Sequence, residues 1–232
     1  MKHYHNKFKM FQSIMKKDNP IIVEVGAHYG EDSLRFSEIF KKAKIYCFEP
    51  DPRNIKIFKK YVNHPNIILY ETALSNEEGE QEFFQSYDKI KGEVVPAKYD
   101  WINLEDYKKN LLSGSGASSL KKGFNQTLSE SIRVKTERFD KWYRDQNISL
   151  IDLMWIDVQG AEKEVIEGMG NEISNIKFIW IEYGELFYEG ALSKTETISL
   201  LNSKNFKKEA EYSNNNSSGD LLFFNTQMDM GQ

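Results

Sequence analysis

The chain has 232 residues, with 31 lysines and arginines against 35 aspartates and glutamates, so its formal net charge is −4. This size suits one α/β domain with a sizeable core, and the weakly acidic balance argues against a basic nucleic-acid binder. A single cysteine, Cys47, excludes an internal disulfide and a multi-cysteine zinc site. No apolar run approaches the roughly 18 residues of a membrane span, and no signal-peptide core follows the basic N-terminus. We therefore expect one cytoplasmic domain over residues 1–232, without stable membrane insertion.

Residues 1–19 place Phe8, Phe11 and Ile14 three apart among lysines, ahead of Pro20. Apolar residues at this spacing predict a short amphipathic helix, which the proline ends. A basic amphipathic helix can bind a membrane surface. Because this one is short, we expect it to pack across the domain as a lid or cap.

The next part of the chain alternates between buried strands and amphipathic helices. This βαβαβ pattern implies a parallel sheet with right-handed crossover connections. The predicted strands cover residues 21–26, 44–49 and 66–70, with helices near 34–40 and 55–61.

The segment at 87–130 interrupts this pattern with polar residues, a helical patch near 101–111 and a loop of small residues at 113–119. A strand near 80–85 precedes it. Long excursions inside compact domains are commonly lids or binding loops. We predict an inserted cap that contacts the acceptor, and the alternative is an inert surface insertion.

The α/β pattern then returns and continues to the C-terminus. A segment that starts as a strand at residue 132 turns helical near residue 139. Further strands are predicted at 150–156, 176–181, 209–212 and 221–224, with helices at 161–169 and 195–201.

Three of the predicted buried strands end in an acid: Glu49, Asp157 and Glu182. A fourth acid, Glu24, lies two residues before the glycine turn of the first strand. Ligands of open parallel sheets bind beyond the carboxyl ends of the strands. We therefore expect these acids to converge on one site, although Asp157 alone could be a cap of the following helix.

The turn after the first strand contains Gly26, His28 and Gly30. A dinucleotide site of the G-x-G-x-x-G type needs glycine where His28 stands, so a pyrophosphate would be crowded. Glu49 follows Gly26 by 23 residues and can accept both ribose hydroxyls of a nucleoside. An acidic rim suits a cationic, phosphate-free nucleoside. The turn therefore favours S-adenosylmethionine over a nicotinamide cofactor.

Five short motifs follow one another along the chain: Glu24-Val-Gly-Ala-His-Tyr-Gly-Glu-Asp-Ser33, Phe48-Glu-Pro-Asp-Pro52, Ala73-Leu-Ser-Asn-Glu-Glu-Gly79, Gly116-Ala-Ser-Ser-Leu120 and Ile156-Asp-Val-Gln-Gly-Ala-Glu162. Together they resemble the FkbM family of S-adenosylmethionine-dependent methyltransferases. The resemblance implies a class I methyltransferase fold, a Rossmann-like, doubly wound seven-stranded sheet that is mostly parallel with an antiparallel last strand. It also implies methylation of an oxygen, commonly of a sugar or polyketide hydroxyl.

Carried over by position, the resemblance divides the cofactor site into four parts. Glu24 stands where the family more commonly has Asp, His28 where it has Asn, and Gln159 where it has Glu. The methionine part falls on Glu24, Gly26, Ala27 and Gly30 with Ser33 close by, the ribose on Glu49, the adenine on Pro50, Asp51, Ala73, Leu74 and Ser75, and the methyl group above Asp157 and Gln159.

An alcohol is a poor nucleophile near neutral pH, so a base or a metal should help to remove its proton. The candidates are Asp157, Glu182 and His28. We place Asp157 first because it ends the central strand beside the expected methyl position. His28 could instead make an ordering hydrogen bond, and Glu182 with Glu185 could hold a divalent cation, although we expect no metal.

We therefore predict an O-methyltransferase that uses S-adenosylmethionine, releases S-adenosylhomocysteine and acts on a small hydroxylated acceptor, most simply a saccharide. One alternative is a nucleic-acid base methyltransferase, which the acidic balance and the missing Asn/Asp-Pro-Pro-Tyr motif disfavour. The other is a non-catalytic scaffold that binds the cofactor and a partner. All four acids, Glu24, Glu49, Asp157 and Glu182, are present, which argues against a non-catalytic protein.

Overall fold

The computed structural model describes residues 2–87, 95–96, 99–109, 114–124, 128–184, 187–213 and 217–228. Its main sheet contains β1 (Ile21–Val25), β2 (Lys44–Phe48), β3 (Ile67–Tyr70), β7 (Ile151–Ile156), β8 (Ile176–Gly184), β9 (Phe206–Ser213) and β10 (Ser218–Asn225).

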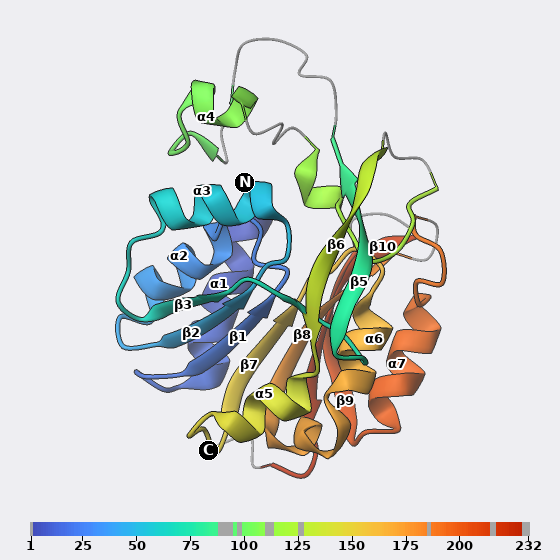
Figure 1. Ribbon diagram of the computed structural model, residues 1–232. Helices are drawn as coiled ribbons and strands as arrows, with labels where there is room; N and C mark the ends of the chain where they lie inside the picture. The colour runs from blue at the N-terminus through green and yellow to red at the C-terminus, as the bar shows by residue number, and fades with distance from the viewer. Residues whose placement is uncertain are drawn as a thin grey trace.

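The seven strands lie in the order β3-β2-β1-β7-β8-β10-β9, between two layers of helices (Figure 1). All neighbouring pairs are parallel except those of β10, which is antiparallel to both β8 and β9. The chain order reverses between β1 and β7, and this switch point is where open α/β sheets bind their ligands. The predicted doubly wound sheet with an antiparallel last strand is confirmed.

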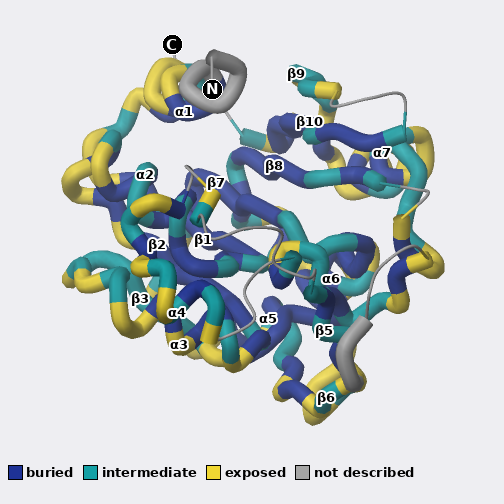
Figure 2. The backbone as a smooth tube through the Cα atoms, turned by 90° about the horizontal axis from the view of Figure 1, so that it is seen from above, coloured by how far each residue is buried: buried dark blue, intermediate teal, exposed yellow. Residues whose placement is uncertain are grey.

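Alternating side chains on the strands give the sheet two apolar faces. Met154 and Ile156 of β7 enter the core on one face, and Leu153 and Trp155 enter the core on the other. Figure 2 shows the central strands buried, while exposed residues gather on the outer helices and loops. One face is covered by α1 (Lys2–Met15), α2 (Glu31–Ile39) and α3 (Pro52–Tyr61), and the other by α5 (Phe139–Asp145), α6 (Glu162–Gly168) and α7 (Lys194–Asn202).

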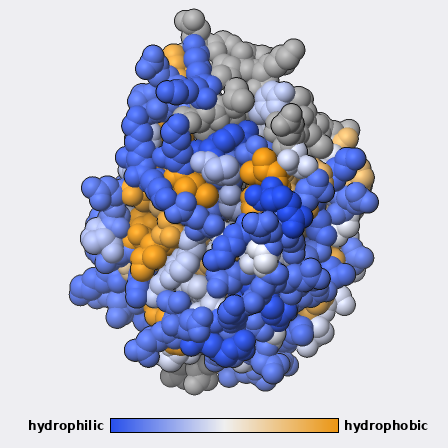
Figure 3. Space-filling model, in the orientation of Figure 1, coloured by the Kyte–Doolittle hydropathy of each residue, from blue (hydrophilic) through white to orange (hydrophobic). Residues whose placement is uncertain are grey.

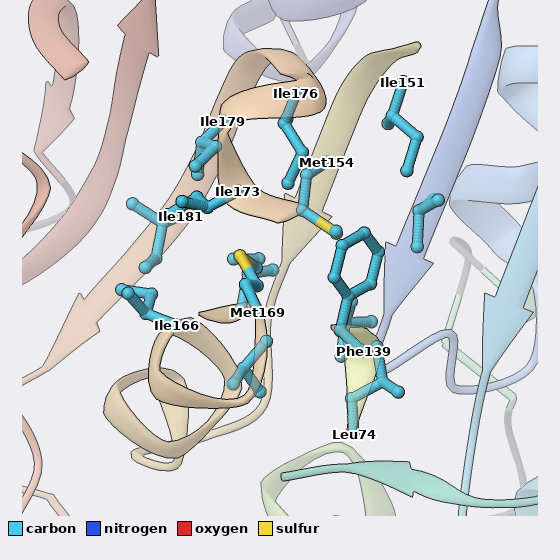
Figure 4. Packing of buried hydrophobic residues seen from close by; sticks show 14 of the residues in the cluster. Leu74, Phe139, Ile151, Met154, Ile166, Met169, Ile173, Ile176, Ile179 and Ile181 are labelled. Atoms are coloured by element: carbon cyan, nitrogen blue, oxygen red, sulfur yellow. The ribbon is translucent and has the colours of Figure 1, made fainter. Parts of the chain in front are cut away.

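The core beneath α6 is built from branched and flexible apolar side chains. Ile179 and Ile181 of β8 and Met154 of β7 belong to one cluster, together with Ile166 of α6 and Met169, which directly follows that helix (Figure 4). Burying each such side chain contributes about 1.5–3 kcal/mol. This packing fixes the positions of the ends of β7 and β8 relative to each other.

The predicted N-terminal helix is α1, which lies against α2 and the sheet. Its residues Phe8, Phe11 and Met15 are buried in the apolar cluster formed with β7, β8 and β10. None of the helices described combines the length and hydropathy that a membrane crossing requires.

A second sheet, in the order β4-β6-β5, was not predicted. It contains β4 (Ala73–Leu74), β5 (Gly79–Ser86) and β6 (Leu128–Glu137). The expected strand near 80–85 is part of β5, and β6 already begins inside the range assigned to the inserted cap. Only two residues form β4, and it pairs with the distant end of β6, so no local periodicity marks it.

Within the inserted segment, the structure describes α4 (Leu104–Lys109) and the short 3-10 helix η2 (Ser115–Ala117). Tyr99, Ile102 and Tyr107 form a small apolar cluster with Tyr29 and Ile57, which joins this segment to α3. Leu111 of the predicted helical patch lies outside the described residues. On the face drawn in Figure 3, hydrophilic residues dominate and hydrophobic residues gather in small separate groups.

Candidate active site

A cavity of about 770 Å³ lies at the carboxyl ends of β1, β2, β7 and β8. Its volume is within the range of about 300–1,000 Å³ that small-molecule sites occupy. The four acids Glu24, Glu49, Asp157 and Glu182 all line it, although β8 continues two residues past Glu182, where the sequence predicted its end. The predicted site residues on its wall are Glu24, Gly26, Ala27, His28, Glu49, Pro50, Ala73, Leu74, Asp157, Gln159 and Glu182.

The turn after β1 is fastened to the neighbouring strand by backbone hydrogen bonds. The N–H groups of Gly26 and Ala27 donate to the carbonyl of Phe48, at 2.9 and 3.0 Å. Gly26 has a φ of +86°, and a Cβ there would lie 1.9 Å from the carbonyl oxygen of Asp157. Backbone conformation and space therefore both require glycine, which lets the turn pack closely against the backbone of Asp157.

Glu49 is buried at the end of β2, and both of its carboxylate oxygens are already oriented. Oε1 accepts from the N–H of Asp51 at 2.8 Å and from Nδ2 of Asn54 at 3.3 Å. Oε2 accepts from the N–H of His28 at 2.8 Å. Burial, and secondly the charge of Asp51, raises the pKa of Glu49 to about 7. A carboxylate has about four lone-pair sites, and three are occupied here, so this group can accept from one further donor such as a hydroxyl.

Asp157 directly follows β7, Glu182 lies near the end of the adjacent β8, and one amide group joins the two acids. Nε2 of Gln159 donates to Oδ1 of Asp157 at 2.6 Å and to Oε2 of Glu182 at 2.7 Å. Its Oε1 accepts from the Tyr188 hydroxyl at 2.7 Å. Burial, and secondly the charge of Asp157, raises the pKa of Glu182 well above its usual range. The pair can therefore hold a proton at the edge of the sheet.

Asp157 does not cap the helix that follows it. The N-cap of α6 is Ala161, which makes no side-chain cap hydrogen bond. Glu162 orders the intervening loop instead, because its Oε1 accepts from the N–H of Val158 at 3.3 Å and of Gly160 at 3.1 Å. The interpretation of Asp157 as a helix cap is therefore wrong, and Asp157 lines the cavity instead.

His28 connects the β1 turn to the loop of small residues from the inserted segment. Its Nδ1 lies 3.0 Å from Oε1 of Glu31, and its Nε2 lies 3.1 Å from Oγ of Ser115. The Tyr29 hydroxyl lies 2.6 Å from the same Oγ. With both ring nitrogens engaged, the geometry of His28 is that of an ordering contact.

Four predicted site residues, Gly30, Ser33, Asp51 and Ser75, lie behind the cavity wall and not on it. Ser33 donates a hydrogen bond to the carboxylate of Glu24, and Asp51 caps the N-terminus of α3. These residues support the wall through their neighbours.

Asn54 lines the cavity, and the sequence analysis missed it. It lies three and four residues before Ile57 and Phe58, on the buried face of α3, so a polar residue on an apolar helix face was the available signal. Its Oδ1 is buried without a hydrogen-bond partner among the described residues. Such an atom points to a bound donor. Other lining residues that were missed are Lys7, Tyr29, Asp32, Ser115, Ser118, Trp155, Trp180, Tyr212 and Asp220.

Together these groups fit a phosphate-free nucleoside that carries a positive charge. Glu49 offers a preorganised acceptor for one ribose hydroxyl, and Asn54 offers a second acceptor beside it. Gly26 and Ala27 of the turn line the cavity, and Glu24 and Asp157 supply negative charge. Among the residues the structure describes, no group of three His, Cys, Asp or Glu side chains is arranged to hold a metal ion, and Glu185 lies outside them.

A seven-stranded sheet of this order, with such a cavity at its switch point, is typical of the class I methyltransferase fold. The chain belongs to the FkbM methyltransferase family, because the model of the methyltransferase FkbM domain matches residues 24–208. The predicted family, fold and cofactor are thereby confirmed.

Two relatives and one solved structure illustrate the similarity. The 2-O-methyltransferase NoeI of Sinorhizobium fredii (strain NBRC 101917 / NGR234) is 32% identical over 230 residues, which cover 93% of this chain and 84% of NoeI. Methyltransferase sdnD of Sordaria araneosa is 25% identical over 166 residues, which cover 66% of this chain and 62% of sdnD. A SAM-dependent methyltransferase from Aquifex aeolicus shares the fold, with a TM-score of 0.50, 10% identity, and coverage of 95% of this chain and 88% of that chain.

Proposed function

We propose that this enzyme methylates a hydroxyl oxygen of a small acceptor, a sugar or glycan, within a single methyltransferase domain. The observation that carries the proposal is the Asp157–Glu182 pair, which Gln159 holds at the edge of the sheet beside the glycine turn. The name of NoeI, a 2-O-methyltransferase 32% identical to this chain, supports transfer to oxygen.

In this proposal the cofactor lies along the ends of β1 and β2. Glu49 accepts from one ribose hydroxyl, and Asn54 accepts a further hydrogen bond beside it. When bound, S-adenosylmethionine supplies an electrophilic methyl group. Pro50, Ala73 and Leu74 contact the adenine, and Glu24, Gly26, Ala27 and Gln159 contact the methionine and methyl part.

Asp157 acts as the base in this arrangement. Its carboxylate accepts the proton of the acceptor hydroxyl, and Gln159 fixes the orientation of that carboxylate. Glu182, with its raised pKa, helps to hold the proton. General-base assistance of this kind typically contributes about 10²–10⁴-fold to a rate.

A saccharide suits the remaining wall of the cavity. Carboxylates accept hydrogen bonds from sugar hydroxyls. Tyr99 and Tyr107 of the inserted segment line the same cavity and offer aromatic rings to the apolar side of a sugar. We propose that this segment, residues 87–130 by sequence, is the cap over the acceptor.

The test is methyl transfer from labelled S-adenosylmethionine to a panel of sugar nucleotides, oligosaccharides, RNA and DNA. Methylated saccharide, detected by mass spectrometry and absent with Asp157→Asn, is the expected result. Methylation of a nucleic-acid base alone would contradict the proposal. Cofactor binding without turnover on any acceptor would favour the non-catalytic scaffold.

A further inference from the structure

The N-terminal helix contributes to the cavity although it precedes the residues that the family model matches, 24–208. Phe8 and Phe11 of α1 pack against Phe36 of α2 and against Trp155 of β7. These contacts hold α1 on the sheet. Lys7, which directly precedes Phe8, is 9% exposed and lines the cavity. The packing of α1 therefore carries a lysine to the end of the sheet.

Aromatic rings hold the ammonium group of Lys7 in place. Its Nζ lies 4.2 Å from the ring centroid of Trp155 and 5.7 Å from that of Trp180. These two rings are stacked, with centroids 5.2 Å apart and an interplanar angle of 13°. A cation over such rings is attracted by their electron-rich faces. The fold thus positions a positive charge at this point of the wall.

Strand register places acids beside the two rings that hold Lys7. Lys7 already interacts with one of these acids, because burial raises the pKa of Asp220 to about 6 and the charge of Lys7 opposes that rise. Trp155 is the partner of Glu24 across the β1–β7 pair and of Trp180 across the β7–β8 pair. Asp220 of β10 is the partner of Glu182. Lys7 is the only lysine or arginine among the described residues of the wall, whose acids are Glu24, Glu31, Asp32, Glu49, Asp157, Glu182 and Asp220.

The amino-acid end of the cofactor carries one ammonium and one carboxylate. The surrounding acids suit the ammonium and the sulfonium, but they repel a carboxylate. An anionic acceptor is disfavoured next to Asp157, Glu182 and Asp220 for the same reason. We infer that Lys7 binds the carboxylate of S-adenosylmethionine, an inference that rests on the proposed placement of the methionine part beside Glu24.

The experiment compares two ligands that differ by this one group. Binding of S-adenosylmethionine and of decarboxylated S-adenosylmethionine is measured by calorimetry for the wild type, Lys7→Met and Lys7→Arg. A hydrogen-bonded charge pair corresponds to a tenfold to hundredfold change in affinity, as an order of magnitude. We expect Lys7→Met to weaken the first ligand by this factor and to leave the second unchanged. Lys7→Arg, which keeps the charge, should retain most of the preference for the carboxylate.

Lys9→Met is the matched control, because Lys9 lies on the same helix and is exposed. It should change neither affinity. An equal loss of both ligands in Lys7→Met would show a merely structural role and overturn the inference, as would equal binding of both ligands by the wild type. A change confined to the KM of the acceptor would also overturn it, while leaving the proposed methyl transfer intact. Lys7→Gln serves as a second neutral variant if Lys7→Met does not fold.

Discussion

The main-chain N–H of His28 donates a hydrogen bond of 2.8 Å to Oε2 of Glu49. The turn that follows β1 and the acid that ends β2 are therefore one unit. Because the donor is backbone, this bond depends on the conformation of the turn and not on the side chain at position 28. Loss of the Glu49 carboxylate would remove both an anchor of the turn and the proposed ribose acceptor.

Replacing this carboxylate by a neutral amide should weaken cofactor binding. Glu49→Gln loses a charged acceptor whose hydrogen bonds are stronger than neutral ones, so the Kd for S-adenosylhomocysteine should rise by about 10- to 100-fold. Calorimetry measures this change. Glu80→Gln, at an exposed position of β5, is the control and should bind as the wild type does. An unchanged Kd in Glu49→Gln would remove Glu49 from the site.

Cofactor affinity should depend on pH through the same group. The pKa of Glu49 is about 7 because of burial, so a large fraction of this carboxyl is protonated below neutral pH. A bound ribose favours the ionised form, so binding should release protons and strengthen from pH 6 to pH 8, then level off. Titrations in buffers of different ionisation enthalpy report the released protons. If Glu49→Gln kept the same pH dependence, another group would be responsible.

Asp157→Asn and Glu182→Gln should separate chemistry from binding. Both variants keep side-chain volume but lose a proton acceptor, so turnover should fall by about 10²–10⁴-fold for Asp157→Asn and by less for Glu182→Gln. S-adenosylhomocysteine binding should change little in either variant. Single-turnover rates with labelled cofactor measure the chemical step. Wild-type rates in Asp157→Asn would exclude this residue as the base.

A comparison of Gly26 with Gly190 tests whether the turn after β1 requires glycine because of steric clash. Both have positive φ, +86° and +74°, but an added Cβ at Gly190 would meet only Nζ of Lys121, at 3.9 Å. Gly190→Ala should therefore lose about 1–2 kcal/mol of unfolding free energy, from the backbone conformation alone. Gly26→Ala should lose more and abolish cofactor binding. Urea denaturation and calorimetry check the two effects, and equal losses would refute the steric argument.

Glu162 should make the stability of the wild type depend on pH. Burial raises its pKa to about 7, above the unfolded value of about 4.3. The folded protein therefore binds the extra proton between these values, and the contribution of this group to stability is lost as pH rises toward 7. Because Glu162→Gln cannot ionise, its stability relative to wild type should improve from pH 5 to pH 8, by about 2–3 kcal/mol. Urea denaturation at both pH values tests this, and a constant difference would contradict it.

Local sequence was sufficient for the main sheet and for most of the cavity wall. Strands such as β7 are buried, mostly apolar runs that an acid follows, and parallel strands bring their carboxyl ends to the same edge. Gly26, Glu49 and Asp157 could therefore be placed together without coordinates. The glycine turn was equally clear, because its signal lies within a few neighbouring residues.

Tertiary structure decided which other side chains share that cavity. Ser33 and Asp51 belong to the predicted motifs but turn toward buried neighbours, whereas Asn54 faces the cavity from the inner side of α3. Gln159 joins two acids that are 25 residues apart in sequence. Lys7 reaches the wall because α1 packs across strands from the other end of the chain. These placements depend on packing and register between distant segments, and the periodicity of a single segment records only its own buried face.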